Sequence, residues 1–127
     1  MLIVVDPSSG VPVFRQVMDQ VRFHIASGLL KAGDELPPTR SLSAELGVNP
    51  MTISKAYNLL ERDGVLERRP GKPLVVAAIA PEEIELEKLV QLRSHLSGAV
   101  RVARQLSLKP GKAIKVFRQM LENEKED

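Results

Sequence analysis

The sequence predicts a mainly α-helical fold with one small β-hairpin, in a chain of 127 residues. Apolar residues recur at helical spacing over most of its length, and β-favouring residues flank one Pro-Gly turn. Hydrophobic residues make up 43% of the chain and charged residues 27%, which is typical of a globule with a buried core. The length suffices for one ordinary domain and a short appendage, so a large catalytic fold is not expected.

The first predicted helix covers residues 11–27. Pro12 suits the first helical position because its missing N–H would have no intrahelical partner. Gly28 then provides a left-handed stop. Residues 29–36 are expected to form a connector with one brief strand, which ends at two consecutive prolines.

Two further helices are predicted at residues 40–46 and at residues 50–63. Thr39 can cap the first of them, and Asn49 followed by proline is a strong start signal for the second. Only residues 47–48 remain as a glycine-bearing turn between them. Two short helices joined by so tight a turn are the sequence pattern of a helix-turn-helix.

A hairpin is predicted next, because β-favouring runs at 65–69 and 74–79 are separated by Pro-Gly-Lys-Pro at 70–73. A helix-turn-helix followed by a β-hairpin is a winged helix. Residues 1–80 are therefore assigned to an N-terminal winged helix-turn-helix domain.

Residues 81–127 are assigned to a C-terminal helical segment with a heptad-like apolar seam that needs a partner. Ser97-Gly98 lies inside the seam and leaves open whether the helix is continuous, kinked or broken there. A further amphipathic helix follows Pro110, and its tail at 122–127 is expected to fray. We expect dimerisation through this segment, although an intramolecular helical hairpin is an alternative. The predicted dimerisation residues are Leu89, Leu92, Leu96, Ala99, Ala103, Leu106 and Phe117.

Composition disfavours several classes of function. The absence of cysteine removes disulfides, thiolate zinc sites and thiol nucleophiles. His24 and His95 are far apart in sequence and are interpreted as ordinary helix residues, so no catalytic residue, metal site or cofactor is predicted. No apolar run is long enough for a membrane helix, and a cytoplasmic protein without a membrane partner is expected.

Bulk charge does not point to nucleic acid, since the formal net charge is only +2. The C-terminal segment nevertheless has a pronounced charge pattern. Eight basic residues and no acid lie between positions 88 and 121, while acids cluster at 82–87 and 122–127. Three interpretations are open: the acidic ends of one subunit face the basic middle of another, the basic block binds an anionic effector, or it is solvated surface.

The predicted helix-turn-helix suggests which side chains would meet DNA. A helix that follows a tight turn can present its first turn to base edges in the major groove. Asparagine can pair with adenine, threonine and methionine can contact a thymine methyl, and lysine can reach guanine or phosphate. The hairpin tip offers cations for phosphate and a glycine that permits close approach. The predicted DNA-binding residues are Thr39, Arg40, Asn49, Met51, Thr52, Ser54, Lys55, Arg69, Gly71 and Lys72.

Several of these residues have a purely structural alternative. Asn49 would serve as a helix cap whatever the function, Lys55 could be solvated surface, and Gly71 could simply satisfy the turn. Arg40 lies in the first turn of its helix, where a cation opposes the helix dipole. A structural role therefore explains Arg40 less well than the others.

Several stretches together resemble the GntR family of bacterial transcription regulators. The resemblance implies a winged-helix DNA-binding domain in which Arg40, the first turn at 49–55 and Gly71 contact DNA. It spans about residues 11–79, more than half of the chain, and is specific because many spaced positions agree in order. The stretches are VPVFRQV at 11–17, IASGLLKAGDELP at 25–37, RSLSAELGV at 40–48, TISKAY at 52–57, LERDG at 60–64 and PGK at 70–72.

Three departures from the family pattern bear on specificity. Pro38-Thr39 stands where the family has serine and glutamate, Asn49-Pro50 replaces the usual Ser-Arg, and Pro-Leu-Val at 73–75 replaces Gly-Thr-Phe. Because the Ser-Arg arginine is the family's usual base contact, the operator is expected to differ from the commonest ones.

With about 47 residues after Ala80, the chain resembles the small YtrA-like branch of the family. Members of this branch often regulate transport genes and are thought to dimerise through their C-terminal helices. The resemblance implies a homodimeric repressor on a palindromic double-stranded DNA operator, with half-sites about 10 bp apart. It also allows a small-molecule effector near the dimer helices. The alternative is a winged-helix protein-interaction module; an enzyme such as an aminotransferase fusion would need several hundred more residues.

Overall fold

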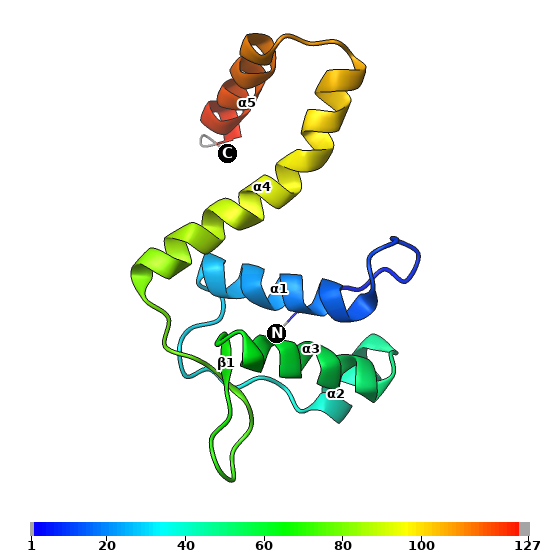
Figure 1. The fold of residues 1–127 in the computed structure, drawn as a ribbon, viewed down its shortest axis with the longest axis vertical. Helices are drawn as coiled ribbons and strands as arrows, with labels where there is room; N and C mark the ends of the chain where they lie inside the picture. Colours follow the sequence, from blue (N-terminus) through cyan, green and yellow to red (C-terminus); the bar gives the residue numbers. More distant parts are fainter. Residues whose placement is uncertain (1, 125–127) are drawn as a thin grey trace. The chain divides into compact units, whose positions relative to one another are not determined.

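The computed structural model describes residues 2–124 and confirms a mainly helical fold with one small hairpin (Figure 1). Contacts divide the chain into two compact units, residues 1–89 and 90–127, and the division falls inside a helix. The assignment of 1–80 and 81–127 to separate functional domains stays a prediction. The elements are α1 (Val13–Ser27), α2 (Thr39–Leu46), α3 (Pro50–Arg62), β1 (Leu66–Glu67), β2 (Val75–Val76), α4 (Pro81–Gln105) and α5 (Pro110–Glu124).

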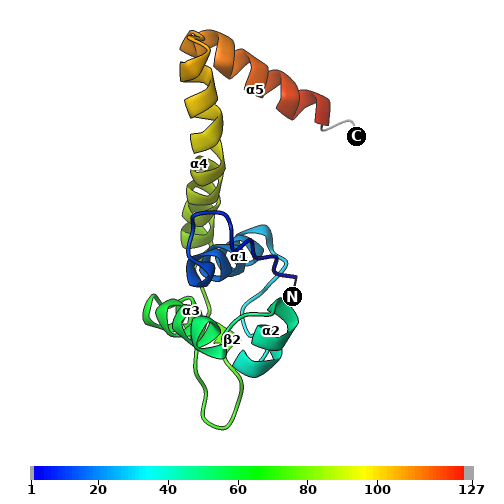
Figure 2. The same ribbon diagram turned by 90° about the vertical axis from the view of Figure 1, so that its right-hand side faces the viewer.

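The core of the first unit lies between α1, α3 and the hairpin. Helix α3 packs against both α1 and α2, and Figures 1 and 2 show α1 and α3 lying side by side. Each helix contributes apolar residues from one face only, as their helical spacing requires. The largest fully buried side chains are Leu42, Ile53, Leu60, Val17, Val21 and Val76.

An N-terminal strap, residues 2–12, is tied to α1 by two glutamines. Gln16 accepts a hydrogen bond from the Asp6 backbone N–H at 2.8 Å and donates to the Asp6 carbonyl at 2.9 Å. One helical turn later, Gln20 forms the same pair of bonds with the backbone of Val4. Each amide thereby satisfies both backbone groups of an extended residue. The strap also inserts Ile3 into the core.

Two helix starts differ from the prediction. Pro12 lies one residue before α1 with a ψ of 142°, outside the helical region. Pro38 occupies the cap position of α2, no side chain makes the cap hydrogen bond, and Thr39 is the first helical residue. The prediction that Thr39 caps α2 is therefore wrong. Proline holds its own φ fixed and disfavours helix at the residue before it, so the two prolines set this boundary without a hydroxyl cap.

The hairpin is shorter than its β-favouring runs. Leu66 pairs with Val76 and Glu67 with Val75 in an antiparallel register, and residues 68–74 form the tip. The brief strand expected within residues 29–36 is a single bridge between Glu35 and Val75. It is reinforced by the Leu36 N–H, which donates to the Leu74 carbonyl at 2.8 Å. The connector thus anchors the base of the hairpin while its tip, called the wing below, extends beyond the helices (Figures 1 and 2).

Helix α4 is continuous from Pro81 to Gln105, so the break considered at Ser97-Gly98 does not occur. A single glycine inside a helix costs only about 1 kcal/mol. The Ser97 hydroxyl donates to the Ser94 carbonyl at 2.8 Å within the helix. After α4, Ser107 takes a left-handed φ of 56° in the turn that leads to α5. Among the described residues, no helix is long and apolar enough to cross a membrane.

Candidate nucleic-acid interface

The turn between α2 and α3 is closed by a glycine and one backbone hydrogen bond. Gly47 adopts a left-handed conformation with φ 68°, which ends α2 as predicted. The Val48 N–H donates to the Ser43 carbonyl at 3.0 Å. Ser43 is itself buried and its hydroxyl donates to the Arg40 carbonyl at 3.0 Å, which leaves no polar group unsatisfied there. These bonds fix the direction in which α3 leaves the turn.

Asn49 caps α3. Its side-chain oxygen accepts a hydrogen bond from the Met51 N–H at 2.8 Å, and Pro50 fills the first helical position. A bidentate pair with adenine would need both the oxygen and the NH₂ group of this side chain. Because the cap engages the oxygen, Asn49 has its NH₂ group left as a donor.

The outer face of α3 begins with an exposed methionine. Ile53, Ala56, Tyr57 and Leu60 are buried, so the residues on the opposite side of the helix face solvent. Met51 is 77% exposed, although an apolar side chain of this size contributes to folding only when it is covered. Thr52 and Ser54 are half-buried at the two edges of this face.

Asn58 lies on the same outer face and is not among the DNA-binding residues predicted from the sequence. It is exposed and stands seven residues after Met51, so it lies two helical turns further along the same ridge. The signal that would have found it is this spacing. Base contacts are concentrated in the first turn of a recognition helix, so the sequence prediction covers only residues 49–55 of this face.

Lys55 lies on the α1 side of the outer face. Its ammonium group lies 4.0 Å from the centroid of the Phe14 ring, within the range of a cation–π interaction. This contact gives Lys55 a role in joining α3 to α1, beyond simple solvation. It also positions the charge beside the exposed face.

The wing contains the predicted Arg69, Gly71 and Lys72. Gly71 has a φ of 71°, a conformation that disfavours other residues, and a Cβ built on it would meet nothing within 4 Å. In the free chain, position 71 therefore favours glycine because of its backbone conformation and not because of a close neighbour. Arg69 approaches Glu67 at 3.4 Å, and the Lys72 N–H donates to the Arg69 carbonyl at 3.1 Å.

A cleft of about 310 Å³, called the wing cleft below, lies between α3, the start of α2 and the wing. Its polar side chains bring together residues from all three elements, and its apolar wall comes from prolines and leucines. Predicted Thr39, Ser54 and Lys72 meet there, joined by Asn58 and Arg68, which were not predicted. Arg40, Asn49, Met51, Thr52, Lys55, Arg69 and Gly71 lie outside its lining.

Tyr57 forms part of the wing cleft and ties α3 to the segment before α2. Its hydroxyl donates to the Pro37 carbonyl at 2.8 Å. Burial raises the pKa of Tyr57 well above its ordinary value of 10.0, so the hydroxyl stays a donor at any physiological pH. The cleft therefore has a neutral wall on this side.

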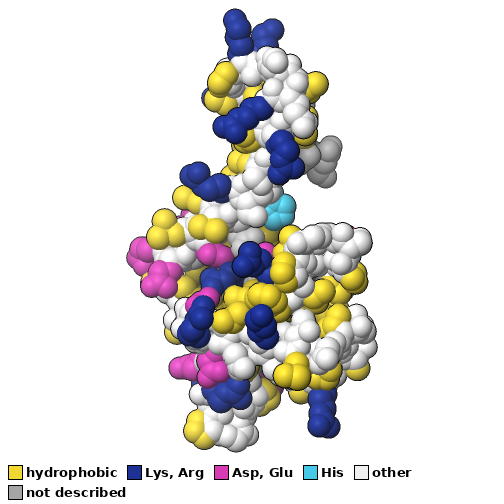
Figure 3. Space-filling view, turned by 45° about the vertical axis from the view of Figure 1, so that its right-hand side comes forward, with side chains coloured by type: hydrophobic (Ala, Val, Ile, Leu, Met, Phe, Trp, Pro, Cys, Tyr) yellow, Lys and Arg dark blue, Asp and Glu magenta, His cyan; other side chains and the backbone are white. Residues whose placement is uncertain are grey.

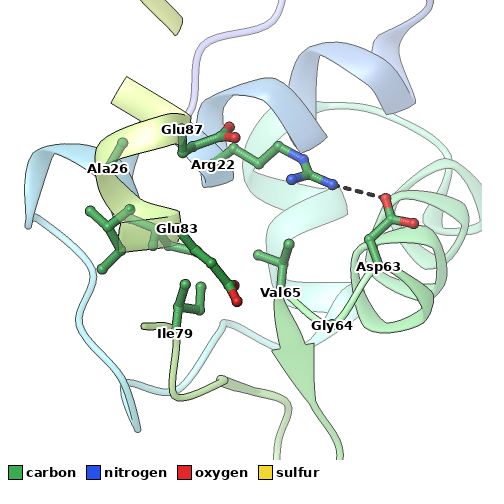
Figure 4. Close-up of a pocket in the computed structure, with 10 residues that line it drawn as sticks. Arg22, Ala26, Asp63, Gly64, Val65, Ile79, Glu83 and Glu87 are labelled. Atoms are coloured by element: carbon green, nitrogen blue, oxygen red, sulfur yellow. Dashed lines mark hydrogen bonds and ion pairs between the residues drawn. The ribbon is translucent and has the colours of Figure 1, made fainter. Parts of the chain in front are cut away.

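A second cavity, of about 200 Å³, lies where the start of α4 meets α1 and the end of α3 (Figure 4). Arg22 of α1 pairs with Asp63 at 2.8 Å across it. Glu83 and Glu87 of α4 line the same cavity. Its volume is below the range of about 300–1,000 Å³ that is usual for small-molecule sites, so its ion pair is best understood as joining two elements of the domain.

The predicted dimerisation residues lie on α4 and α5, apart from Leu106 in the turn just after α4, and this part of the chain is open to solvent in the single chain. Among the described residues, no side chain of α4 is buried, and α4 and α5 do not pack extensively on each other. In Figure 3, hydrophobic and basic side chains gather on α5 and on the end of α4 that leads into it. Leu89, Leu92, Ala99, Leu106 and Phe117 are exposed, and Leu96 and Ala103 are half-buried.

Metal-binding clusters of His, Asp or Glu do not occur in the part of the chain that the structure describes. The site is instead an exposed helix after a tight turn, next to a hairpin with a basic tip. These features define a winged helix-turn-helix of the DNA-binding class.

Comparisons with known proteins specify that class. The profile described as "Bacterial regulatory proteins, gntR family" matches residues 14–76. The chain is 33% identical over 95 residues to the HTH-type transcriptional repressor YtrA of Bacillus subtilis. These 95 residues make up 75% of this chain and 73% of YtrA. The chain therefore belongs to the GntR family of bacterial regulatory proteins, a family of transcription regulators, and is similar to YtrA within it.

Solved structures agree with this placement. YtrA from Sulfolobus acidocaldarius, a GntR-family transcription factor, is 29% identical with a TM-score of 0.58, over 95% of this chain and 97% of that one. The DNA-binding domain of AraR, solved in complex with operator ORX1, is 26% identical with a TM-score of 0.52, over 61% of this chain and 95% of that one. The protein is a DNA-binding transcription regulator.

Proposed function

We propose that the protein is a homodimeric repressor that binds a palindromic operator through two winged helices. The observation that carries this proposal is the apolar surface that α4 and α5 leave uncovered in the single chain. Monomeric soluble proteins rarely expose contiguous apolar faces, and such faces mark interaction sites. A second copy of the chain supplies the same seam, as two-fold symmetry requires.

The free energy gained by burying the seam is large enough for a second copy of the chain to cover it. Full removal of a leucine side chain from water contributes about 1.5–3 kcal/mol. The seam holds four leucines per subunit, of which Leu89 and Leu106 are more than 60% exposed. A dimer would cover two such seams, and the sum is comparable with the cost of association, about 4–15 kcal/mol. The apolar side chains of α5, including Phe117, would add to it.

Charge complementarity suggests how the two copies are arranged. The basic block between positions 88 and 121 contains no acid, and acids flank it on both sides. We propose that the acidic ends of one subunit face the basic middle of the other. Screening would then weaken the dimer as salt rises, which sedimentation equilibrium at several ionic strengths measures. A dimer constant that is flat from low to high salt would leave the anionic-effector and solvated-surface interpretations.

On the operator, we propose that the outer face of α3 enters the major groove and that the wing follows the DNA backbone. Met51 would contact a thymine methyl group, and Arg40 would read a base or hold a phosphate beside it. Asn49 would cap the helix through its oxygen and donate from its NH₂ group. The net charge of +2 gives little non-specific attraction, so discrimination would depend on a few such contacts.

Repression would act by occlusion of the promoter, with a small-molecule effector changing the balance between subunit arrangements. We place the effector in a cavity of about 320 Å³ lined by the end of α1, the hairpin and the first turns of α4. Ile25 and Ile84 give it an apolar wall, and Lys31 and Lys88 line it too, which favours a small organic anion.

A thermal-shift screen of small carboxylates and phosphates tests this site. A compound that stabilises the wild type but not Ile84→Trp supports it, and no stabilising compound contradicts it.

The whole proposal is tested by selection of the purified protein against random duplex DNA at near-physiological salt, followed by sequencing of the bound pool. We expect a palindrome with half-sites about one helical turn apart. An enriched single half-site would contradict the dimeric arrangement. A pool without enrichment would contradict sequence-specific repression by the protein alone.

A further inference from the structure

We propose that the wing cleft is a binding site for one phosphodiester group of the DNA backbone, and that Arg68 is its principal cationic ligand. The ligand chemistry is a singly charged phosphate on a continuous strand. This inference rests on the proposed placement of α3 in the major groove and adds a contact that neither the sequence pattern nor the comparisons assign.

The position of the cleft leads to this ligand. If α3 lies in the major groove and the wing follows the neighbouring DNA backbone, as proposed above, that strand of backbone passes at the place where α3 and the wing meet. The wing cleft is the concavity at that place, with α3 on one side and the wing on the other. Its volume of about 310 Å³ is ample for a phosphate group and its adjoining sugar atoms.

The lining residues match a phosphodiester. Arg68 and Lys72 bring positive charge from the wing, and Ser54 and Asn58 bring neutral donors from α3. The cleft lining includes no carboxylate residue. An arginine guanidinium can donate two parallel hydrogen bonds to phosphate oxygens, which gives Arg68 the leading role.

In the free chain, Arg68 pairs with the carboxylate of Glu61, a residue of α3 that does not line the cleft. Its guanidinium nitrogen lies 3.4 Å from the Glu61 carboxylate, and its side chain is 58% exposed. A contact this long and this exposed is a weak ion pair. A backbone phosphate can therefore replace Glu61 at small cost, and Glu61 acts as an intramolecular competitor for Arg68.

The experiment measures binding of the full chain to a labelled non-specific duplex of about 20 base pairs between about 50 and 200 mM salt. Phosphate contacts do not depend on sequence, so the operator need not be known. We expect Arg68→Ala to weaken binding and to reduce the slope of log Kd against log salt by about one. Arg68→Lys should retain the slope, because the charge is kept.

Glu61→Gln provides the second arm. Releasing Arg68 should tighten binding about 1.4- to 5-fold, the value of an exposed ion pair in equilibrium constants. That gain should vanish in the background of Arg68→Ala. Glu45→Gln on α2 is the matched control, since it removes the same charge from an exposed residue that forms no ion pair with Arg68.

Two results would overturn the proposal: an unchanged salt slope in Arg68→Ala, or an equal gain from Glu61→Gln in both backgrounds. Failure of the dimeric repressor function is a separate outcome. It would show as the absence of an enriched palindrome in the selection, while the salt slopes on non-specific duplex would still report on Arg68.

Discussion

Replacement of Asn49 by alanine separates the two roles that the sequence allows for this residue. The Asn49 side chain accepts the Met51 N–H at 2.8 Å and supplies the side-chain cap of α3. Its removal leaves one N–H of the first turn without its partner. Loss of an asparagine cap typically costs about 0.5–2 kcal/mol, and about 1 kcal/mol is expected here because solvent can reach the exposed helix start.

The assay is urea unfolding of the wild type and of Asn49→Ala, followed by far-ultraviolet circular dichroism. A loss of about 1 kcal/mol lowers the urea midpoint of unfolding by about 0.3–1 M, given a slope of about 1–3 kcal/mol per M for small proteins. The slope of the unfolding free energy against urea should not change, since the core is untouched. An unfolding free energy equal to that of the wild type would refute the cap as an energetic contribution.

Asn49→Asp then isolates the DNA role. Aspartate is as good a cap as asparagine, so the unfolding free energy should be retained. It has no NH₂ donor and adds a negative charge beside the DNA, so operator binding should fall. If Asn49→Asp bound the operator as well as the wild type, the NH₂ group of Asn49 would have no part in recognition.

Three further predictions concern the dimer, the hydroxyl in the wing cleft and the base contact. Leu92→Asp should give a monomer in sedimentation velocity. Val102 is a similarly exposed residue of α4 outside the seam, so Val102→Asp should leave the dimer intact. Monomers in both variants would indicate general damage to the helix. The folded state holds the Tyr57 proton above pH 10.0 while the unfolded chain releases it, so stability should fall as pH rises past 10 and the fall should be absent in Tyr57→Phe. Since the chain has one tyrosine and no tryptophan, its tyrosinate absorbance gives this pKa directly, and an ordinary value would contradict the burial argument. Arg40→Ala should weaken operator binding by about 1–3 kcal/mol in a titration if Arg40 reads a base, and unchanged binding would remove it from the interface.

The elements with strong local signals were predictable from the sequence. Gly28 and Gly47 end their helices because a left-handed residue is required there, and Asn49-Pro50 starts α3 because cap and φ requirements coincide. These effects act within a few residues and need no tertiary partner. The order of helices and hairpin follows from them.

What the sequence could not supply depends on tertiary contacts. Thr39 has the right chemistry for a cap, but the two preceding prolines fix the backbone so that no cap forms. Asn58 and Arg68 are ten residues apart along the chain, and no local pattern links them. Only the fold of the wing beside α3 brings them into one cleft.

Gln16 illustrates the same limit. Its place in the stretch VPVFRQV at 11–17 gives no hint of a partner. In the structure, its side chain forms two hydrogen bonds with the backbone of Asp6 in the N-terminal strap. The strap has no helical or strand periodicity, so its position along α1 could not be predicted. Its contacts explain why a glutamine serves well at this point of the helix.

The most direct test of the account compares a palindromic operator with the same duplex in which one half-site is scrambled. Fluorescence anisotropy would measure the Kd of each duplex for the wild type and for Leu92→Asp. The account predicts that scrambling weakens the wild type strongly, because both winged helices are held in one dimer, and that the monomeric variant loses little. Equal losses for the two proteins would contradict dimeric recognition of the operator.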